Sequence, residues 1–258
     1  MIDAKDIADE LAAAERDRRA ITPFSDAHPD FDVETAYRAQ EAFVASKLAA
    51  GERLVGAKLG LTSRVKQREM SVDQPLYGMV TSGMLAPFGE PLDVAAFIHP
   101  RVEPEIAFLI GRDVPAPATV TSVLAATEAV FGAVDVLDSR YEDFRFTLPD
   151  VVADNASAGA FLLGSQSRSP ADVVDLRLLG CVLRVGGDVV ATAAGAGTMG
   201  HPAAAVAWLA NRLAERDEVL RAGWLVFSGG LTAPVPIAPG VVVTAEFDGL
   251  GSVEVYGR

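Results

Sequence analysis

Glu103 and Glu105 are the residues whose type and spacing most directly suggest chemistry. They precede a run of apolar residues that predicts a buried strand, and side chains two residues apart in a strand lie on one face. Two carboxylates at the mouth of an apolar strand repel each other and resist the loss of water. A divalent cation such as Mg²⁺ or Mn²⁺, which prefers oxygen ligands, would relieve both penalties. The spacing also fits an exposed strand end with Arg101 as the ion-pair partner of two solvated acids.

Asp135 is the candidate for a third oxygen ligand, because it stands between two valines in a short apolar segment. An acid there needs a partner, and a cation held by the glutamate pair would supply one. The alternative is an ion pair with Arg140 or Arg145. Asp138, three residues on, falls on the opposite strand face and is interpreted as a structural residue.

Lys58 lies in a small, apolar setting between Gly56 and Gly60. A lysine drawn into such a site exchanges its proton near neutrality more readily than an exposed one, and flanking glycines let a ligand approach the backbone. This predicts a role for Lys58 in proton transfer or charge stabilisation. The alternative is an ordinary lysine at a strand edge whose ammonium group reaches water.

Residues 195–200 match the dinucleotide-binding pattern G-x-G-x-x-G, and Asp217 and Glu218 follow at about the expected spacing. In that motif, however, the acid ends a second strand, whereas these two acids end a predicted helix. The match also lies too near the C-terminus for a doubly wound domain. We interpret it as a glycine-rich turn before a helix. No histidine stands in a serine- or cysteine-nucleophile pattern, so acyl transfer has no support.

Composition excludes several classes of protein. The net charge is −13 and the isoelectric point is about 4.6, which disfavours a nucleic-acid or anionic-membrane partner. Cys181 is the only cysteine, which excludes an intrachain disulfide and a cysteine-based zinc site. The first residues are too acidic for a targeting peptide, and no apolar run reaches membrane-spanning length. We therefore expect a cytoplasmic protein.

The elements that must position these residues are helical early in the chain and mostly extended later. This order, without regular βαβ alternation, predicts an α+β fold. We expect an N-terminal region over 1–75 that is helical with some αβ structure, and a catalytic domain over 76–258. Helices are predicted at 5–19, from Asp32 to about Gly51, at 119–130 and at 203–214; strands at 54–61, 133–137, 182–185, 189–192, 224–227, 241–247 and 252–256; and a loop at 63–83.

Four segments in the same order resemble the hydratase/decarboxylase family of the fumarylacetoacetate hydrolase superfamily, and the resemblance covers nearly the whole chain. They are GAKLGLTS (56–63), PRVEPEIAF (100–108), VADNAS (152–157) and GLGSV (249–253). The resemblance implies a mixed β-roll fold with Mg²⁺ or Mn²⁺ held by three carboxylates. Glu103, Glu105 and Asp135 fall on the ligand positions, the last often a glutamate in the family, and Lys58 on the active-site lysine.

The family contains decarboxylases of 4-oxalocrotonate (2-oxo-3-hexenedioate) and hydratases of 2-hydroxypenta-2,4-dienoate, both from the meta-cleavage degradation of aromatic compounds. Hydratases typically carry an aspartate at the position of Leu76, and residues 139–146 and 229–236 are similar to the decarboxylases. The resemblance therefore favours decarboxylation, with hydration as the alternative. A C–C hydrolase would need a water-activating base that we do not find.

The resemblance also implies how a small dicarboxylate 2-oxo acid is held. Thr232 would bind the C1 carboxylate, Arg140 or Tyr141 would bind the distal end, and Leu76 would also contact the substrate. A homo-oligomer and a complex with a homologous hydratase subunit are the implied assemblies. A catalytically weak partner subunit is a further alternative, against which the acids and Lys58 argue.

Overall fold

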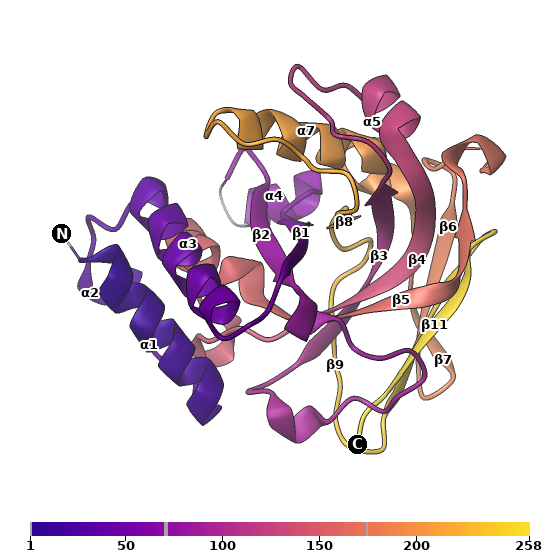
Figure 1. The fold of residues 1–258 in the computed structure, drawn as a ribbon. Helices are drawn as coiled ribbons and strands as arrows, with labels where there is room; N and C mark the ends of the chain where they lie inside the picture. The colour runs from indigo at the N-terminus through magenta and orange to yellow at the C-terminus, as the bar shows by residue number, and fades with distance from the viewer. Residues whose placement is uncertain (1, 70–71, 174) are drawn as a thin grey trace.

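Helices form one flank of the molecule in the computed structural model, which describes residues 2–69, 72–173 and 175–258. They are α1 (Ala4–Asp17), α2 (Phe24–Ala27) and α3 (Val33–Ala49), and α1 packs on α3 (Figure 1). The helices predicted for the first fifty residues are confirmed. Asp32 caps α3 as expected, since its Oδ1 accepts a hydrogen bond from the Thr35 amide at 2.8 Å.

The polar side chain of Gln40 interrupts the buried stripe of α3 for a structural reason. Its amide donates to the carbonyls of Tyr77 and Val152, both at 2.9 Å. These carbonyls belong to strand β2 (Leu76–Thr81) and helix α6 (Leu148–Ala153). Gln40 thus links α3 to two elements near the candidate site. Both hydrogens of its buried amide nitrogen have an acceptor.

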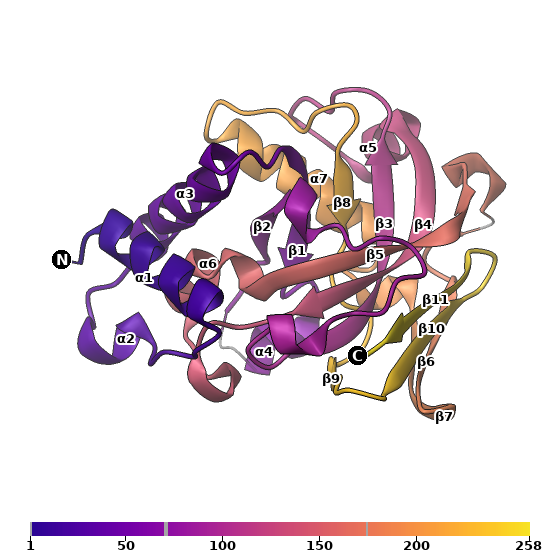
Figure 2. The same ribbon diagram turned by 60° about the horizontal axis from the view of Figure 1, so that its bottom comes forward.

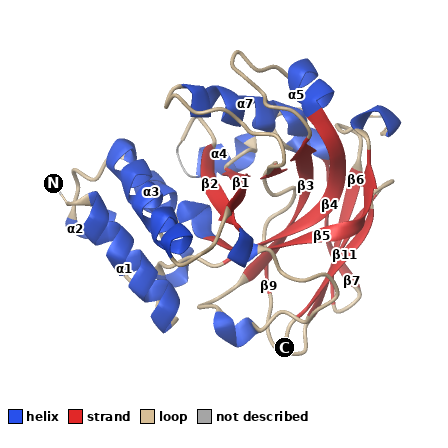
Figure 3. Ribbon diagram, in the orientation of Figure 1, coloured by secondary structure: helices blue, strands red, loops and turns tan. Residues whose placement is uncertain are grey.

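A seven-stranded sheet forms the centre of the fold, in the order β2-β1-β8-β3-β4-β5, with β9 paired to β3 (Figures 1 and 3). The β1–β8 pair is parallel and the other pairs are antiparallel. Strand β8 comes from the last part of the chain yet lies between β1 and β3. The remaining bounds are β1 (Leu54–Gly60), β3 (Arg101–Ile110), β4 (Thr127–Leu137), β5 (Ala158–Arg168), β8 (Leu225–Phe227) and β9 (Val235–Pro236).

A second sheet has the order β11-β10-β6-β7 and lies beside the β4 and β5 end of the first (Figure 2). Its strands are β6 (Gly180–Val185), β7 (Asp188–Ala194), β10 (Val242–Phe247) and β11 (Gly251–Tyr256). Helices α5 (Val120–Ala126) and α7 (Pro202–Ala214) pack on each other, and α7 also contacts β1. The predicted hairpin is confirmed, with Gly186 and Gly187 both at positive φ in its turn.

The large sheet curls into a roll, and this curvature brings distant strands together. Neighbouring strands lie about 4.8 Å apart, so β1 and β4, three positions apart, would be separated by about 14 Å in a flat sheet. Instead Lys58 of β1 contacts Asp135 of β4 across the concave face. Small side chains on that face, Ala107 and Ala133, are fully buried and leave room for the curvature. The expected α+β class is confirmed.

Several predicted boundaries are corrected. The expected loop at 63–83 contains helix α4 (Arg64–Glu69) and strand β2, and the helix expected at 119–130 ends at Ala126, where β4 begins. Strand β5 and helix α6 were not predicted. The expected division after residue 75 falls between β1 and β2, which pair with each other, and it stays a prediction. Within the described part of the chain, no helix combines the length and the apolar character needed to cross a bilayer.

Candidate metal centre and active site

The three predicted acids meet on the concave face of the roll. Glu103 on β3 is directly opposite Asp135 on β4, and Glu105 lies on the same face of β3. One carboxylate oxygen from each acid lies within 4.8 Å of the others. Glu105 and Asp135 are fully buried and Glu103 is 5% exposed, so the exposed strand end is excluded. The opposite face of β3 is core as expected, with Val102, Ile106, Phe108 and Ile110 fully buried.

The carboxylates present oxygens without protein partners. Glu105 Oε2 accepts a hydrogen bond from the Gly229 amide at 2.7 Å, but Glu105 Oε1 and Asp135 Oδ1 are buried without a hydrogen-bond partner among the described residues. Burial raises the pKa of the Glu105 carboxyl well above its ordinary value, and the charges of Asp135 and Glu103 raise it further. Burial also raises the pKa of Asp135 to about 6, against the opposing effect of Lys58. Converging, unpaired carboxylate oxygens are a donor set that fits Mg²⁺ or Mn²⁺.

Lys58 is buried beside this cluster, so the alternative of a lysine that reaches water is excluded. Its Nζ lies 2.5 Å from Asp135 Oδ2 and donates to the Ala156 carbonyl at 2.8 Å. Arg140 and Arg145, the alternative partners of Asp135, pair instead with Asp154 and Asp26. The ammonium group is therefore fixed between Asp135, a candidate metal ligand, and the Ala156 carbonyl.

The turn that supplies the Ala156 carbonyl has an unusual backbone. Asn155, Ala156 and Ser157 have φ values of 49°, 56° and 55°, in the left-handed region that glycine normally occupies. Such conformations cost on the order of 1–3 kcal/mol each and persist where surrounding contacts fix them. Here the Asn155 amide exchanges two hydrogen bonds with the backbone of Met79, at 2.7 and 2.8 Å. This anchors the turn, which accounts for the VADNAS segment noted in the sequence.

Lys66 is a second lysine at the centre, and sequence reasoning missed it. Its Nζ donates to Glu103 Oε2 at 2.9 Å. Although burial opposes its charged form, attraction to Glu103 leaves the pKa of the Lys66 ammonium above its ordinary value. No sequence signal links the two residues, because they are 37 positions apart and Lys66 lies in the expected loop.

Glycines after β8 allow the close packing around the acids. A Cβ at Gly230 would lie 2.1 Å from Glu103 Oε2, so any side chain there would collide with that carboxylate. Gly229 adopts φ +103°, and a Cβ there would lie 2.0 Å from Thr62 Oγ1. The absence of side chains at Gly229 and Gly230 thus lets the backbone after β8 pack directly against Thr62 and Glu103.

A cavity of about 330 Å³ opens beside the acids, large enough for a small organic acid. Its lining combines charged and apolar side chains. The charged residues are Lys58, Lys66, Glu103 and Arg101; the apolar side chains are Leu61, Leu76, Leu137, Phe144, Phe146, Val151, Ala156 and Pro234.

The predicted substrate-binding residues lie in three places: this cavity, an adjoining cavity and the protein interior. Leu76 lines the cavity. Thr232 lines an adjoining cavity of about 950 Å³, which shares Lys66 and Pro234 with the first, and its hydroxyl donates to the Ala233 carbonyl at 3.0 Å.

Arg140 and Tyr141 are corrected to framework residues. Both are buried outside the cavity. The Arg140 guanidinium pairs with Asp154 and donates to the Ala158 carbonyl at 2.8 Å, and the Tyr141 hydroxyl donates to the Asp150 carbonyl at 3.2 Å. Their polar groups are satisfied within the fold, so neither is free to hold a substrate. Asp138 is structural as expected, since it accepts hydrogen bonds from the amides of Ile98 and His99.

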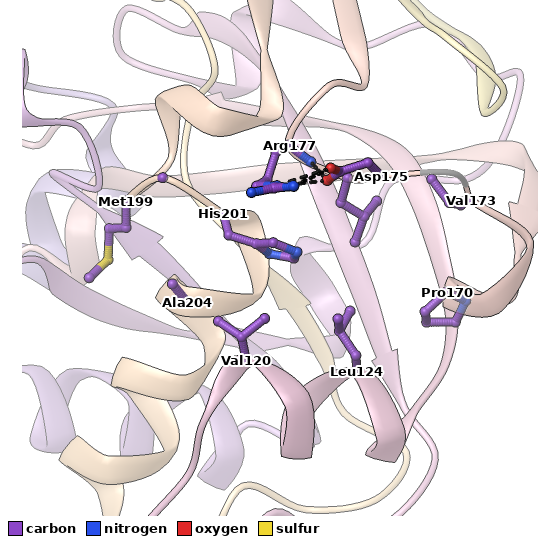
Figure 4. Close-up of a pocket in the computed structure, with 11 residues that line it drawn as sticks. Val120, Leu124, Pro170, Val173, Asp175, Arg177, Met199, His201 and Ala204 are labelled. Carbon is purple, nitrogen blue, oxygen red and sulfur yellow. Dashed lines mark hydrogen bonds and ion pairs between the residues drawn. The ribbon is translucent and has the colours of Figure 1, made fainter.

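The glycine-rich match at 195–200 borders two cavities. Ala196, Gly197, Met199 and Gly200 line the cavity that contains Thr232, and Met199 and Gly200 also line another of about 630 Å³ (Figure 4). Figure 4 shows Asp175 and Arg177 paired at its rim, with His201 below them. His201 caps α7, because its Nδ1 accepts a hydrogen bond from the Ala203 amide at 3.0 Å. The match follows the antiparallel hairpin β6–β7 and forms a short turn, as expected, so the dinucleotide-binding interpretation is excluded by its context.

Comparison with known proteins identifies the family of the chain. Residues 48–256 match the family model for the C-terminal domain of fumarylacetoacetate (FAA) hydrolase. The chain is 43% identical over 248 residues to a 4-oxalocrotonate decarboxylase of Pseudomonas sp. (strain CF600), covering 96% of this chain and 94% of that one. It is 38% identical over 250 residues to a 2-keto-4-pentenoate hydratase of Paraburkholderia xenovorans (strain LB400), covering 96% and 93%.

A solved structure shows the same fold. It is the 4-oxalocrotonate decarboxylase from Pseudomonas putida G7 complexed with magnesium and adipate, which matches with a TM-score of 0.95 at 39% identity and covers 99% of this chain and 97% of that one. The resemblance read from four sequence segments is confirmed. The chain belongs to the fumarylacetoacetate hydrolase family.

Proposed function

We propose that this protein is a Mg²⁺-dependent carboxy-lyase that converts 4-oxalocrotonate to 2-hydroxypenta-2,4-dienoate and CO₂. The observation that carries the proposal is the group of three buried, converging carboxylates with unpaired oxygens, beside a cavity that also contains Lys58. The relatives named 4-oxalocrotonate decarboxylase support the choice of reaction.

Glu103, Glu105 and Asp135 would hold the cation, with Mn²⁺ as the alternative metal. When bound, Mg²⁺ supplies a Lewis acid for the 2-keto oxygen, on which negative charge develops as CO₂ leaves a vinylogous 2-oxo acid. Each tenfold gain in rate requires about 1.4 kcal/mol of such stabilisation.

Lys58 has the geometry to act on the same charge. Its ammonium group is held by Asp135 and the Ala156 carbonyl, so it needs no reorganisation to donate a proton or a hydrogen bond into the cavity. We propose that it stabilises the dienolate or shuttles its proton. Thr232, at the edge of the adjoining cavity, is proposed to help hold the C1 carboxylate.

The apolar residues that line the cavity favour decarboxylation over hydration. Leu76 is 2% exposed and lines the cavity where hydratases of the family typically carry an acid, so the residue offers no group to activate water. Leu137 and Phe146 extend the same apolar surface, which suits release of neutral CO₂.

The hydratase activity is the second candidate, because relatives with that name are up to 41% identical to this chain. The test supplies Mg²⁺-loaded protein with 4-oxalocrotonate and, separately, with 2-hydroxypenta-2,4-dienoate, and follows CO₂ release and hydration. We expect CO₂ from the first substrate and little turnover of the second. Turnover of the second alone would assign the hydratase reaction instead.

Assembly and location are further proposals. We propose a homo-oligomer that associates with a homologous hydratase subunit in the cytoplasm, since the product of one enzyme is the substrate of the other. The exposed Val189 and Val190 on edge strand β7 are compatible with such an interface. Sedimentation of the protein alone and mixed with the hydratase tests the assembly, and cell fractionation tests the location.

A further inference from the structure

Three cationic side chains line the cavity, and one of them differs from the others. Lys58 pairs with Asp135, and Lys66 pairs with Glu103. Arg101 has no carboxylate within ion-pair distance among the described residues. Its charge is therefore available to a ligand.

Aromatic stacking holds Arg101 in place. The centre of its guanidinium group lies 3.9 Å from the Phe144 ring centroid. The Phe144 ring also packs on His99, with 4.7 Å between the two ring centroids. Phe144 adopts φ +56°, a conformation that a bulky residue rarely takes. His99 is itself fixed by a 2.7 Å hydrogen bond to the Ser139 carbonyl. A guanidinium stacked in this way keeps its N–H edge free for bidentate binding of a carboxylate.

The spacing of Arg101 from the metal ligands suits a short diacid. Arg101 and Glu103 are two residues apart on one face of β3, which separates their backbones by about 7 Å. Both side chains line the same cavity. An extended six-carbon diacid spans on the order of 6 Å between its terminal carbons, given carbon–carbon bonds of about 1.5 Å. One carboxylate can therefore lie at the acidic cluster while the other reaches Arg101.

The charges around the cavity point the same way. Three carboxylates, two lysines and a divalent cation leave one net positive charge, which matches a monoanion. Arg101 adds a second positive charge, which matches a dianion.

We propose that Arg101, positioned on Phe144, binds the distal carboxylate and selects dicarboxylate over monocarboxylate ligands. This inference rests on the proposed function for the identity of the substrate. It replaces Arg140 and Tyr141, which the sequence suggested for this end of the substrate and which the fold buries elsewhere.

The test measures binding separately from turnover. Calorimetry on Mg²⁺-loaded protein compares adipate with hexanoate, a monoanion of equal length. In Arg101→Met we expect adipate to bind about tenfold to one-hundredfold more weakly and hexanoate to change by less than about threefold. Arg101→Lys keeps the charge and should recover part of the loss. Arg145→Met is the matched control, because Arg145 is the chain neighbour of Phe144 but pairs with Asp26 on the surface.

Two further measurements make each outcome decisive. Mg²⁺ affinity and thermal unfolding of Arg101→Met should match the wild type, which separates lost recognition from a damaged fold or metal centre. An equal loss of adipate and hexanoate, or no loss of either, would overturn the inference. If the wild type releases no CO₂ yet the adipate selectivity depends on Arg101, the proposed reaction fails while the role of Arg101 stands.

Discussion

Replacement of Gly230 by alanine should weaken metal binding without unfolding the protein. The new Cβ would lie 2.1 Å from Glu103 Oε2, and a separation of 3.0 Å is the least that real Cβ atoms show, so the carboxylate must move by about 0.9 Å. Metal–ligand distances tolerate only about 0.2 Å of error. Changes around a metal ligand alone cost about 10- to 100-fold in affinity, so we expect at least about a tenfold loss of Mg²⁺ affinity, or about 1.4 kcal/mol.

The same substitution should change the free energy of unfolding by no more than about 1 kcal/mol. Gly230 does not have the positive φ that would strain an alanine, and the obstructing atoms are the mobile end of a side chain. Titration calorimetry with Mg²⁺ and denaturant unfolding of the metal-free protein measure the two effects. Gly180→Ala is the control, since its Cβ would meet no atom within 4 Å. Equal Mg²⁺ affinity in Gly230→Ala, Gly180→Ala and the wild type would refute Glu103 as a ligand.

Three further predictions concern the same cluster. Glu105→Gln should abolish Mg²⁺-dependent turnover while the metal-free fold remains intact or gains stability, because a buried charge is removed; circular dichroism and turnover assays check this. Lys58→Met should cost the metal-free protein about 3–5 kcal/mol in denaturant unfolding, since the buried Asp135 loses its partner; a change below 1 kcal/mol would contradict the ion pair. Because the pKa of Asp135 is raised to about 6, protonation stabilises the metal-free protein as pH falls from 7 towards 4 and competes with the cation. Mg²⁺ affinity, measured by calorimetry, should therefore decrease as the pH is lowered through about 6. Asp135→Asn should remove the contribution of Asp135 to the pH dependence of the free energy of unfolding.

The acidic cluster was predictable because strand geometry converts spacing into direction. Alternation placed Glu103 and Glu105 on one face and the apolar residues on the other, and the structure has that arrangement. Asp135 could be named from its apolar flanks, although its pairing opposite Glu103 depends on a register that the sequence does not specify. Local sequence pattern predicts the position of a side chain when a single strand or helix determines that position.

The arginines show where local pattern fails. The sequence suggested Arg101 only as the ion-pair partner in the alternative of an exposed strand end, and Arg140 as a substrate-binding residue. Arg101 instead lines the cavity, and Arg140 is buried against Asp154. Nothing within a few residues of either distinguishes them, because burial is set by the curl of the whole sheet. Helix α4 and strand β2 were missed for a related reason, since tertiary packing stabilises short elements whose own propensities are weak.

The position of β8 has a consequence for how the protein is made. This strand joins β1, which carries Lys58, to β3, which carries Glu105, yet Leu225 follows Ile110 by 115 residues. While the chain leaves the ribosome, β1 and β3 therefore have unpaired inner edges until Leu225–Phe227 has been synthesised. The Gly229 amide that binds Glu105 arrives at the same time. The candidate metal centre and the closed sheet are completed by the same event, so a chain that stops before β8 has neither.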